Sequence, residues 1–272
     1  MVKTGNKCCI TIDDYFDLEQ TLNCGQAFRF IPQSDGSFDG VVMDRVCNVS
    51  FEDNRLIIFS NADEDFWRFY FDIDTDYGAI QKQFRVIPNL DKACRYAGGI
   101  RVLRQNGWEA LASFIISQNN NIKRISGIIE RLCENFGQPI EGCDRFSFPE
   151  PEEIAKLTIE DLAPLRCGFR ARYLIDAANK VVNGDVDLEK LKTCPVEQAR
   201  ESLKSIVGVG NKVADCTLLF GCHRIECLPV DVWIARALKE LFPSGIPQEI
   251  LPVAGIAQQM LFHYMRTGRS KD

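Results

Sequence analysis

The amino-acid sequence predicts an α+β fold, with an N-terminal antiparallel β-sheet domain followed by a larger, mostly α-helical domain. Residues 26–60 contain β-rich, alternating runs separated by turn residues, whereas apolar residues at helical spacing dominate from Asp91 onward. We therefore expect a domain boundary near residues 85–95, with a sheet domain over 1–90 and a helical domain over 91–272.

Four strands are expected in the sheet domain, with turn residues at 34–36 and 53–54 between neighbouring runs. They are Ala27–Gln33, Phe38–Met43, Val46–Glu52 and Leu56–Ser60. The aromatic run Phe66–Phe71 follows. Because large aromatic side chains bury much apolar area, we expect this run to seal the sheet against helices.

The helical domain is expected to contain a series of amphipathic helices joined by loops rich in Gly, Pro and Asp, notably 137–151 and 183–187. The expected helices are Asp91–Tyr96, Trp108–Ser117, Ile122–Phe136, Phe169–Val182, Pro195–Ile206, Asn211–Phe220, Val232–Leu241 and Ala254–Arg266. No internal repeat or low-complexity tract interrupts them.

The composition of the 272 residues, with 46% hydrophobic and 26% charged residues, is typical of a soluble globular protein. No apolar run reaches membrane-spanning length, and the N-terminal residues lack the apolar core of a secretory signal. We therefore expect an intracellular protein, cytoplasmic or nucleoid-associated in a prokaryote. The 12 cysteines include no C-x-x-C pair and are accompanied by two histidines, which disfavours a zinc site and favours buried thiols in a reducing compartment.

The most distinctive motif is a turn between two expected helices. Gly208, Val209 and Gly210 form the turn, and Lys212 and a Pro-Val-Asp sequence ending at Asp231 follow it. The glycines would allow positive φ and the close approach of a large partner. The free amides at the start of the second helix suit a phosphate group.

Together these residues resemble the helix-hairpin-helix motif of the HhH-GPD superfamily of DNA glycosylases, and a lysine at the position of Lys212 marks its bifunctional branch. Further motifs between Gly25 and Phe262 resemble those of 8-oxoguanine DNA glycosylase/AP lyases in the same order. The resemblance implies no catalytic metal or organic cofactor, and it allows a structural monovalent cation on backbone carbonyls near Val207. No cysteine follows Asp231, which excludes the subgroup with an iron–sulfur cluster.

Lys212 and Asp231 are the expected catalytic pair. A helix N-terminus disfavours a cation, so the amine of Lys212 should become neutral more readily than that of a surface lysine and could attack a sugar carbon. Asp231 precedes an apolar helix and is expected to be its N-cap. The resemblance implies that its carboxylate also stabilises positive charge on the sugar. From position alone, a solvated lysine and a purely capping aspartate are the alternatives.

Two segments are expected to contact DNA and the base opposite the lesion. The resemblance implies that Asn119 fills the gap left by a flipped base and that Arg124 reads the orphaned partner base. It also implies that Phe169 wedges into the opposite strand and that Arg170 donates to the estranged cytosine. An ordinary N-cap and turn at the asparagines, and a helix start with solvated arginines at 170–172, are the alternatives.

The lesion pocket is expected to combine three distant segments. The resemblance implies that the carbonyl of Gly25 accepts the N7–H that 8-oxoguanine has and guanine lacks, a bond that discriminates strongly in a buried pocket. It places Cys216 on one face of the base, Phe262 on the other, and Gln258 at the base edge. Each of these residues would singly be read as core.

Two features depart from the pattern of a DNA-binding family member. Many relatives have histidine at the position of Trp233, where it touches a phosphate; the Trp233 indole N–H could donate instead. The net charge is −6, with 8 Lys and Arg against 15 Asp and Glu in residues 1–90 and 24 against 23 in the remainder. DNA affinity would therefore depend on local placement of cations and backbone amides.

The sequence thus predicts a bifunctional enzyme of base excision repair that removes 8-oxoguanine, preferably opposite cytosine. It would use base flipping, a Schiff base on Lys212 and β-elimination, acting as a monomer on double-stranded DNA. A glycosylase for another damaged base and a non-catalytic helix-hairpin-helix module are the alternatives. The loop at Gly25 argues against the first, and the presence of both Lys212 and Asp231 argues against the second.

Overall fold

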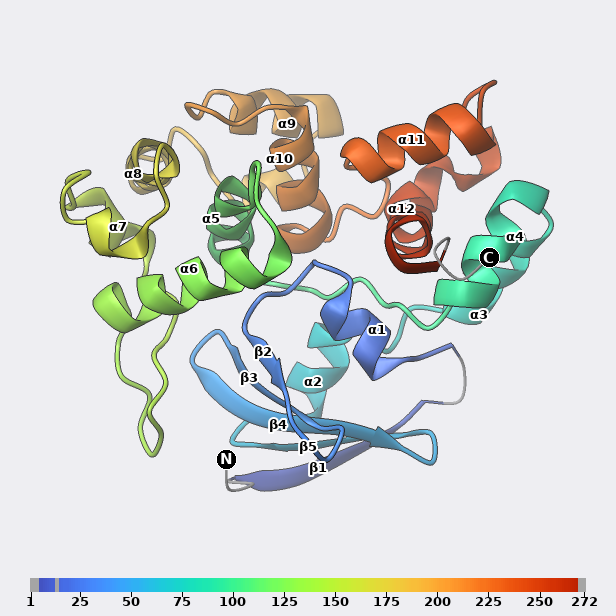
Figure 1. The fold of residues 1–272 in the computed structure, drawn as a ribbon, viewed down its shortest axis with the longest axis horizontal. Coiled ribbons are helices and arrows are strands. Elements are labelled where there is room, and N and C mark those ends of the chain that lie inside the picture. The colour runs from blue at the N-terminus through green and yellow to red at the C-terminus, as the bar shows by residue number, and fades with distance from the viewer. Residues whose placement is uncertain (1–4, 13–14, 269–272) are drawn as a thin grey trace.

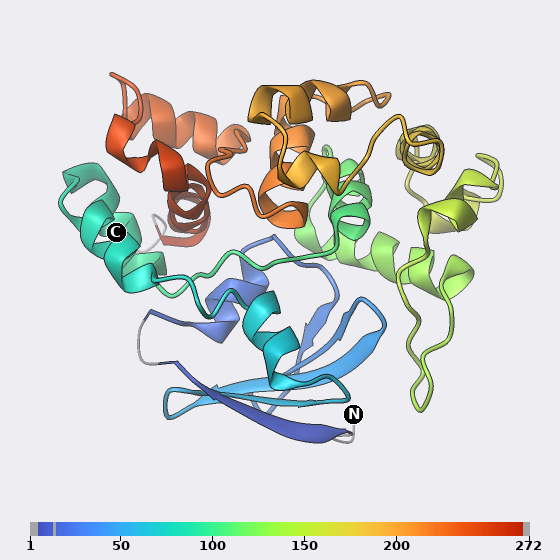
Figure 2. The same ribbon diagram turned by 180° about the vertical axis from the view of Figure 1, so that it is seen from behind.

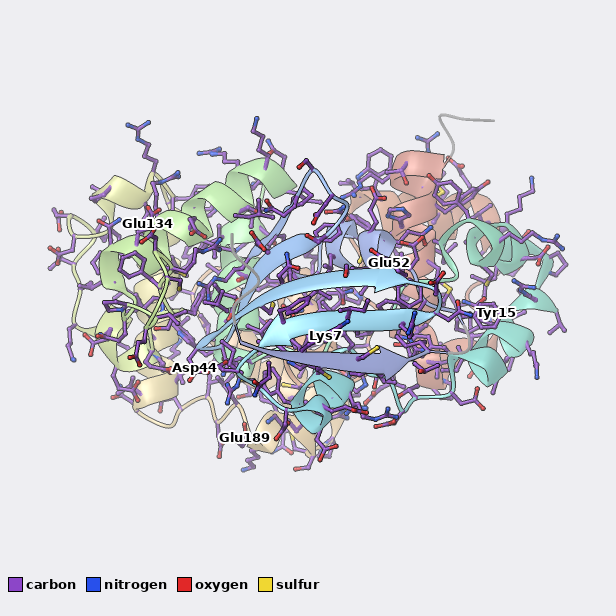
Figure 3. The ribbon with its side chains drawn as sticks, turned by 90° about the horizontal axis from the view of Figure 1, so that it is seen from below. Lys7, Tyr15, Asp44, Glu52, Glu134 and Glu189 are labelled. Atoms are coloured by element: carbon purple, nitrogen blue, oxygen red, sulfur yellow. The ribbon has the colours of Figure 1, made fainter. Side chains whose placement is uncertain are left out.

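The computed structural model describes residues 5–12 and 15–268, which form a sheet layer and a helical layer (Figure 1). One antiparallel sheet contains β1 (Asn6–Thr11), β2 (Phe30–Pro32), β3 (Phe38–Val42), β4 (Arg45–Glu52) and β5 (Arg55–Ser60), in the order β1-β5-β4-β3-β2. The register pairs Val49 of β4 with Ile58 of β5, and both side chains are fully buried. From below, β1, β5 and β4 lie in front of the helices, with Lys7 and Glu52 labelled on them (Figure 3).

The three strands expected over 38–60 are confirmed with small changes at their ends, but the first expected strand is much shorter, and β1 was not expected. Residues 27–29 leave the sheet because the preceding bend, with Gly25 at φ +82°, carries this segment toward the helical layer. Buried Gln26 stabilises this position of residues 27–29, since its Nε2 donates a hydrogen bond to the carbonyl of Arg101 at 2.8 Å.

Two short helices, α1 (Leu18–Asn23) and α2 (Glu64–Tyr70), lie between the sheet and the other helices (Figure 1). Trp67 of α2 is fully buried and joins Tyr70 and Phe71 in the apolar cluster that contains Val49 and Ile58. The expectation that the aromatic run seals the sheet is therefore confirmed.

The helical layer contains all eight expected helices, and α6 and α11 have the expected bounds. Its α-helices are α3 (Tyr77–Arg85), α4 (Pro88–Ala97), α5 (Gly107–Ser117), α6 (Ile122–Phe136), α7 (Pro151–Ala155), α8 (Arg170–Val182), α9 (Val196–Lys204), α10 (Asn211–Cys216), α11 (Val232–Leu241) and α12 (Ala254–His263). Helices α10 and α12 continue as π-helical turns, η3 (Thr217–Gly221) and η5 (Tyr264–Gly268). Helices α3 and α7 were not expected; α7 is too short to show helical periodicity.

Two apolar cores correspond to the two layers, and each core includes residues from chain segments outside its own layer. Cys24 and Phe28 come from the N-terminal segment but pack in the helical core, as do Tyr77 and Phe84 of α3. Leu103 comes from the segment between α4 and α5 but packs in the sheet core. This segment runs between the two layers (Figure 2). The α+β fold class is confirmed, whereas the division at residue 90 stays a prediction.

A buried carboxylate joins the layers. Asp72 follows α2 in the left-handed region at φ +52°, and its side chain is 1% exposed. Its Oδ1 accepts hydrogen bonds from Nη2 of Arg104 at 2.7 Å and from the Thr75 hydroxyl at 2.8 Å. Nε2 of His223, which follows η3, lies 3.4 Å from the same oxygen. Burial by itself raises the pKa of Asp72, but the bonds from His223, Thr75 and Arg104 outweigh it and lower the pKa to about 2.

We predict that Asp72→Asn lowers the free energy of unfolding by about 2–4 kcal/mol at neutral pH, because it removes the buried anion that partly buried Arg104 and the Thr75 hydroxyl bind. A carboxyl whose pKa falls from 3.8 to about 2 on folding stabilises the protein fully above about pH 4, and this contribution is lost as the pH drops toward 2. Urea unfolding between pH 2 and 7 should therefore show the difference between wild type and variant narrowing below pH 4. A pH-independent difference would contradict this account.

Candidate active site

The hairpin packs closely against α8 because Gly208 has no side chain. Gly208 takes φ +80°, and a Cβ at this position would lie 2.4 Å from the Tyr173 ring. Gly210 differs from the expectation, because it has φ −104° and is the N-cap of α10. A Cβ on Gly210 would meet nothing within 4 Å, so this side of the hairpin is open. The backbone N–H of Val207 donates to Oδ2 of Asp176 at 2.7 Å, which fixes the start of the turn.

A cavity of about 740 Å³ lies beside the hairpin, and residues from both halves of the chain line it. Of the expected site residues, those that line it are Gly25, Asn119, Gly210, Lys212, Asp231 and Phe262. Trp233 is also in its wall. The expected residues that are not in its wall are Gly208, Cys216, Gln258, Arg124, Phe169 and Arg170.

Lys212 is held by residues of α5 that the sequence analysis did not identify. Its Nζ donates to Oγ of Ser117 at 3.1 Å and lies 5.0 Å from the centre of the Phe114 ring. Ser117 in turn donates its only hydroxyl proton to the carbonyl of Phe114 at 2.7 Å, so its oxygen can only accept from Lys212. The Nζ atom therefore lies at the C-terminal end of α5 and near the Phe114 ring, as well as beside the start of α10. The neutral amine expected for Lys212 stays a prediction.

Asp231 is the N-cap of α11, as expected. Its Oδ1 accepts from the backbone N–H groups of Trp233 at 3.0 Å and of Ile234 at 2.9 Å. Capping directs one oxygen toward the helix and leaves the carboxylate in the wall of the cavity that also contains Lys212. The alternative of a purely capping aspartate therefore explains the hydrogen bonds of Asp231 but not its position in the cavity wall.

The expected lesion pocket is only partly open, because some of its residues are packed or buried. A Cβ on Gly25 would lie 3.3 Å from Cδ1 of Ile122 and 3.7 Å from Cε1 of Phe262, so these side chains pack closely against the glycine. Cys216 and Gln258 are buried, with 3% and 4% of their surfaces exposed. Burial raises the pKa of the Cys216 thiol to about 11, although neighbouring Lys212 lowers it in part. The thiol is therefore protonated at neutral pH.

The two expected DNA-reading segments touch each other through Arg170. Arg170 is 3% exposed, and its guanidinium donates to the carbonyls of Cys167 and Asn119, both at 3.1 Å, and to that of Gln118. The alternative of a solvated arginine at this position is wrong. Phe169 is 47% exposed beside it.

Arg170 thus holds the asparagine segment in place. Asn119 in that segment takes φ +48° and is exposed at the cavity. The Oδ1 of Asn121 accepts from the backbone N–H of Arg124 at 3.0 Å, so the alternative of an ordinary N-cap at the asparagines holds for Asn121.

Within the described ranges, no group of three or more His, Cys, Asp or Glu is placed to hold a metal ion. No helix among the described residues is both long and apolar enough to cross a membrane. A monovalent cation near Val207 stays a prediction.

The hairpin, and the cavity that gathers Lys212 and Asp231, form the arrangement expected for a helix-hairpin-helix DNA glycosylase. Two family models match the chain. The 8-oxoguanine DNA glycosylase N-terminal domain matches residues 9–111, and the HhH-GPD superfamily base excision DNA repair protein matches residues 112–249.

Solved structures and a curated relative agree with these matches. MBOgg1 in complex with a low-affinity DNA ligand is 41% identical, with 98% of this chain and 97% of that chain covered and a TM-score of 0.90. The Clostridium acetobutylicum 8-oxoguanine glycosylase/lyase, in complex with DNA containing cytosine opposite 8-oxoguanine, is 33% identical, with 94% and 93% covered and a TM-score of 0.86. An N-glycosylase/DNA lyase of Saccharomyces cerevisiae is 43% identical over 155 residues, which cover 52% of this chain and 41% of that protein.

This chain therefore spans less than half the length of the Saccharomyces protein. It belongs to the 8-oxoguanine DNA glycosylase family of the HhH-GPD superfamily of base excision DNA repair proteins. The family resemblance inferred from the sequence is confirmed.

We predict that Ser117→Ala lowers the rate of covalent trapping on abasic DNA by about 10- to 100-fold, because Lys212, the expected nucleophile, would lose the hydrogen bond that positions its Nζ. DNA affinity should change little. Buried Ser113 lies on the same helix and contributes no hydrogen bond to Lys212, so Ser113→Ala is the matched control. Equal effects of the two substitutions in a single-turnover assay would refute a specific role for Ser117.

Proposed function

We propose that this protein is a bifunctional DNA glycosylase/AP lyase that excises 8-oxoguanine from double-stranded DNA in base excision repair. One observation carries the proposal: Lys212 and Asp231 line the same cavity as Gly25 and Phe262, although these residues are far apart in the sequence. The names of the relatives support it, since they are an 8-oxoguanine glycosylase/lyase and an N-glycosylase/DNA lyase.

In the proposed reaction the damaged nucleotide leaves the helix and enters the cavity. Neutral Lys212 attacks C1′ of the deoxyribose, an N–C1′ bond forms, and the bond from C1′ to the base breaks, with its electron pair leaving on the base. The Asp231 carboxylate stabilises the positive charge that develops on the sugar. The base anion takes up the proton that the Lys212 nitrogen loses. Ring opening then gives a protonated Schiff base, as O4′ leaves C1′ with the electron pair and takes up a proton from water. Water removes a C2′ proton, the C2′–H electron pair forms a C2′=C3′ bond, and the C3′–O bond breaks to expel the 3′ phosphate; hydrolysis of the Schiff base releases Lys212.

The pocket residues would discriminate the base. We propose that the Gly25 carbonyl accepts N7–H of the lesion, that Phe262 and Cys216 pack on its two faces, and that Gln258 bonds to its edge. Because Ile122 and Phe262 both pack against Gly25, we propose that these two side chains separate when the base enters. We propose that Trp233, which lines the cavity, donates its indole N–H to a phosphate of the flipped nucleotide.

We further propose that cytosine is preferred opposite the lesion. Arg124 is exposed at the start of α6, where an orphaned base could meet it, whereas Arg170 first has to release the carbonyls of Gln118 and Asn119. Phe169 would wedge into the opposite strand, Asn119 would fill the vacated stack, and the open hairpin at Gly208 and Gly210 would bind a phosphate. The protein would act as a monomer without a catalytic metal or organic cofactor.

We predict that borohydride traps wild-type protein covalently on a duplex containing 8-oxoguanine opposite cytosine, and that Lys212→Gln forms no adduct. The adduct is expected because borohydride reduces a lysine Schiff base. An adduct only on a ready-made abasic site would support the lysine chemistry and reject the proposed base. No adduct on either duplex would indicate a non-catalytic DNA-binding module.

We also predict that excision opposite cytosine exceeds excision opposite adenine by at least about 10-fold, since each good bidentate base contact contributes roughly 1–3 kcal/mol of discrimination. Single-turnover rates on the two duplexes measure the ratio, and Arg124→Ala should reduce it. Equal excision rates for wild-type protein on the two duplexes would contradict the proposed roles of Arg124 and Arg170 in reading the opposite base.

A further inference from the structure

Arg266 lines the cavity but has no role in the reaction described above. It lies in η5, directly after α12, and its Nη2 donates to the carbonyl of Asn23 at 3.0 Å. Its guanidinium carbon lies 5.2 Å from the centre of the Phe262 ring. A Cβ on Gly25 would lie 3.8 Å from its Nη1. One side chain thus contacts both walls of the expected lesion pocket.

These contacts place Arg266 at the N-terminal side of the Gly25 bend. Asn23 is the last residue of α1, so its carbonyl has no partner within that helix and is satisfied by the guanidinium. The C-terminal side of the bend is held by fully buried Gln26, whose Oε1 accepts from the backbone N–H of Leu103 at 3.0 Å. Gly25 itself, at φ +82°, has no side chain that could anchor it.

A simple capping role for Arg266 does not account for all of its contacts. A cation that only satisfied the end of α1 could extend into solvent, whereas this guanidinium lies against Phe262 and next to Gly25. Burial lowers the pKa of Arg266, which nearby Cys24 and Asp231 raise in part. An arginine remains charged under such conditions, so its hydrogen bond to Asn23 is a charge-assisted bond.

We propose that Arg266 is a positioning residue for lesion recognition, which fastens the Gly25 bend to the Phe262 wall and thereby fixes the carbonyl that reads the oxidised purine. This inference rests on the proposed function. A hydrogen bond that separates two bases differing by one N–H requires an accurately placed acceptor, because the bond weakens steeply when its geometry is distorted.

The proposal separates two reactions of the same enzyme. Excision of 8-oxoguanine requires the base pocket, and therefore requires the Gly25 bend in its correct position. Cleavage at a ready-made abasic site involves no base and requires only the sugar-directed groups, Lys212 and Asp231. Loss of Arg266 should therefore affect the first reaction far more than the second.

The test compares Arg266→Gln, Arg266→Lys and Lys123→Gln with wild type. Single-turnover excision is measured on an 8-oxoguanine·cytosine duplex, and covalent trapping on an abasic·cytosine duplex. Lys123 also lines the cavity, but it lies on the asparagine side, so its substitution removes a cation without touching the Gly25 bend. Trapping on abasic DNA also shows that each variant is folded.

For Arg266→Gln we expect the ratio of the excision rate to the trapping rate to fall by about 10- to 100-fold, since small displacements in an active site have effects of this size. Arg266→Lys should recover part of the ratio, because lysine keeps one donor for Asn23. Lys123→Gln should change both rates by the same factor and leave the ratio at the wild-type value.

Three outcomes would overturn the proposal. A ratio that stays at the wild-type value in Arg266→Gln would show that Arg266 does not position the pocket. An equal fall of the ratio in Lys123→Gln would indicate that the charge of the cavity matters and not the bond to Asn23. Wild-type protein that traps on abasic DNA but leaves 8-oxoguanine intact would overturn both this proposal and the proposed substrate.

Discussion

The carboxylate of Asp72 connects the sheet layer to the helical layer that contains the cavity. Arg104 binds it from the segment between the layers, and His223 approaches it from the helical layer just after η3. Gly25 belongs to the N-terminal part of the chain, whereas Lys212 and Asp231 belong to the helical layer. The Gly25 bend nevertheless packs with the helical layer, since Cys24 and Phe28 on either side of it belong to the helical core. Because a buried carboxylate without its hydrogen-bond donors is costly, the Asp72 junction favours one arrangement of the two layers.

The electrostatics of the site are local. The chain is acidic, with a net charge of −6, yet three cations, Lys123, Lys212 and Arg266, line one cavity together with Asp231. A phosphodiester near the cavity would meet these cations at short range, where screening by salt is weaker than across the whole surface. Lys212 also shows how neighbouring elements oppose one another, since α10 disfavours a cation at its start and the end of α5 favours one at the same point.

Some of the residues expected to contact DNA or the lesion make contacts within the protein. Arg170 binds the backbone of the asparagine segment, and Ile122 and Phe262 pack against Gly25. The Phe169 ring, in contrast, is already exposed. In the function we propose, DNA binding would exchange the internal contacts for contacts with bases. Part of the free energy of DNA binding would then be used to open the site. Substrates that fill the site completely would be favoured, because their contacts offset this free energy.

The sequence by itself determined the elements and motifs that depend on local chemistry. Apolar spacing was sufficient for α6 and α11, an aspartate before an apolar run was sufficient for the cap at Asp231, and glycine at position 208 was sufficient for the left-handed turn. Such features depend on neighbours within a few residues, so a single sequence contains the information that they require.

Only the tertiary structure decided which distant residues meet. The pairing of Ser117 with Lys212, the bond from buried Arg170 to the Gln118 carbonyl and the bond from Arg266 to the Asn23 carbonyl join residues between 52 and 243 positions apart. β1 and the shortened β2 likewise depend on partner strands and on the Gln26 contacts. The sequence around these residues contains no periodic pattern that predicts the contacts. The contacts depend on how the complete layers pack against each other, so they are determined only in the folded chain.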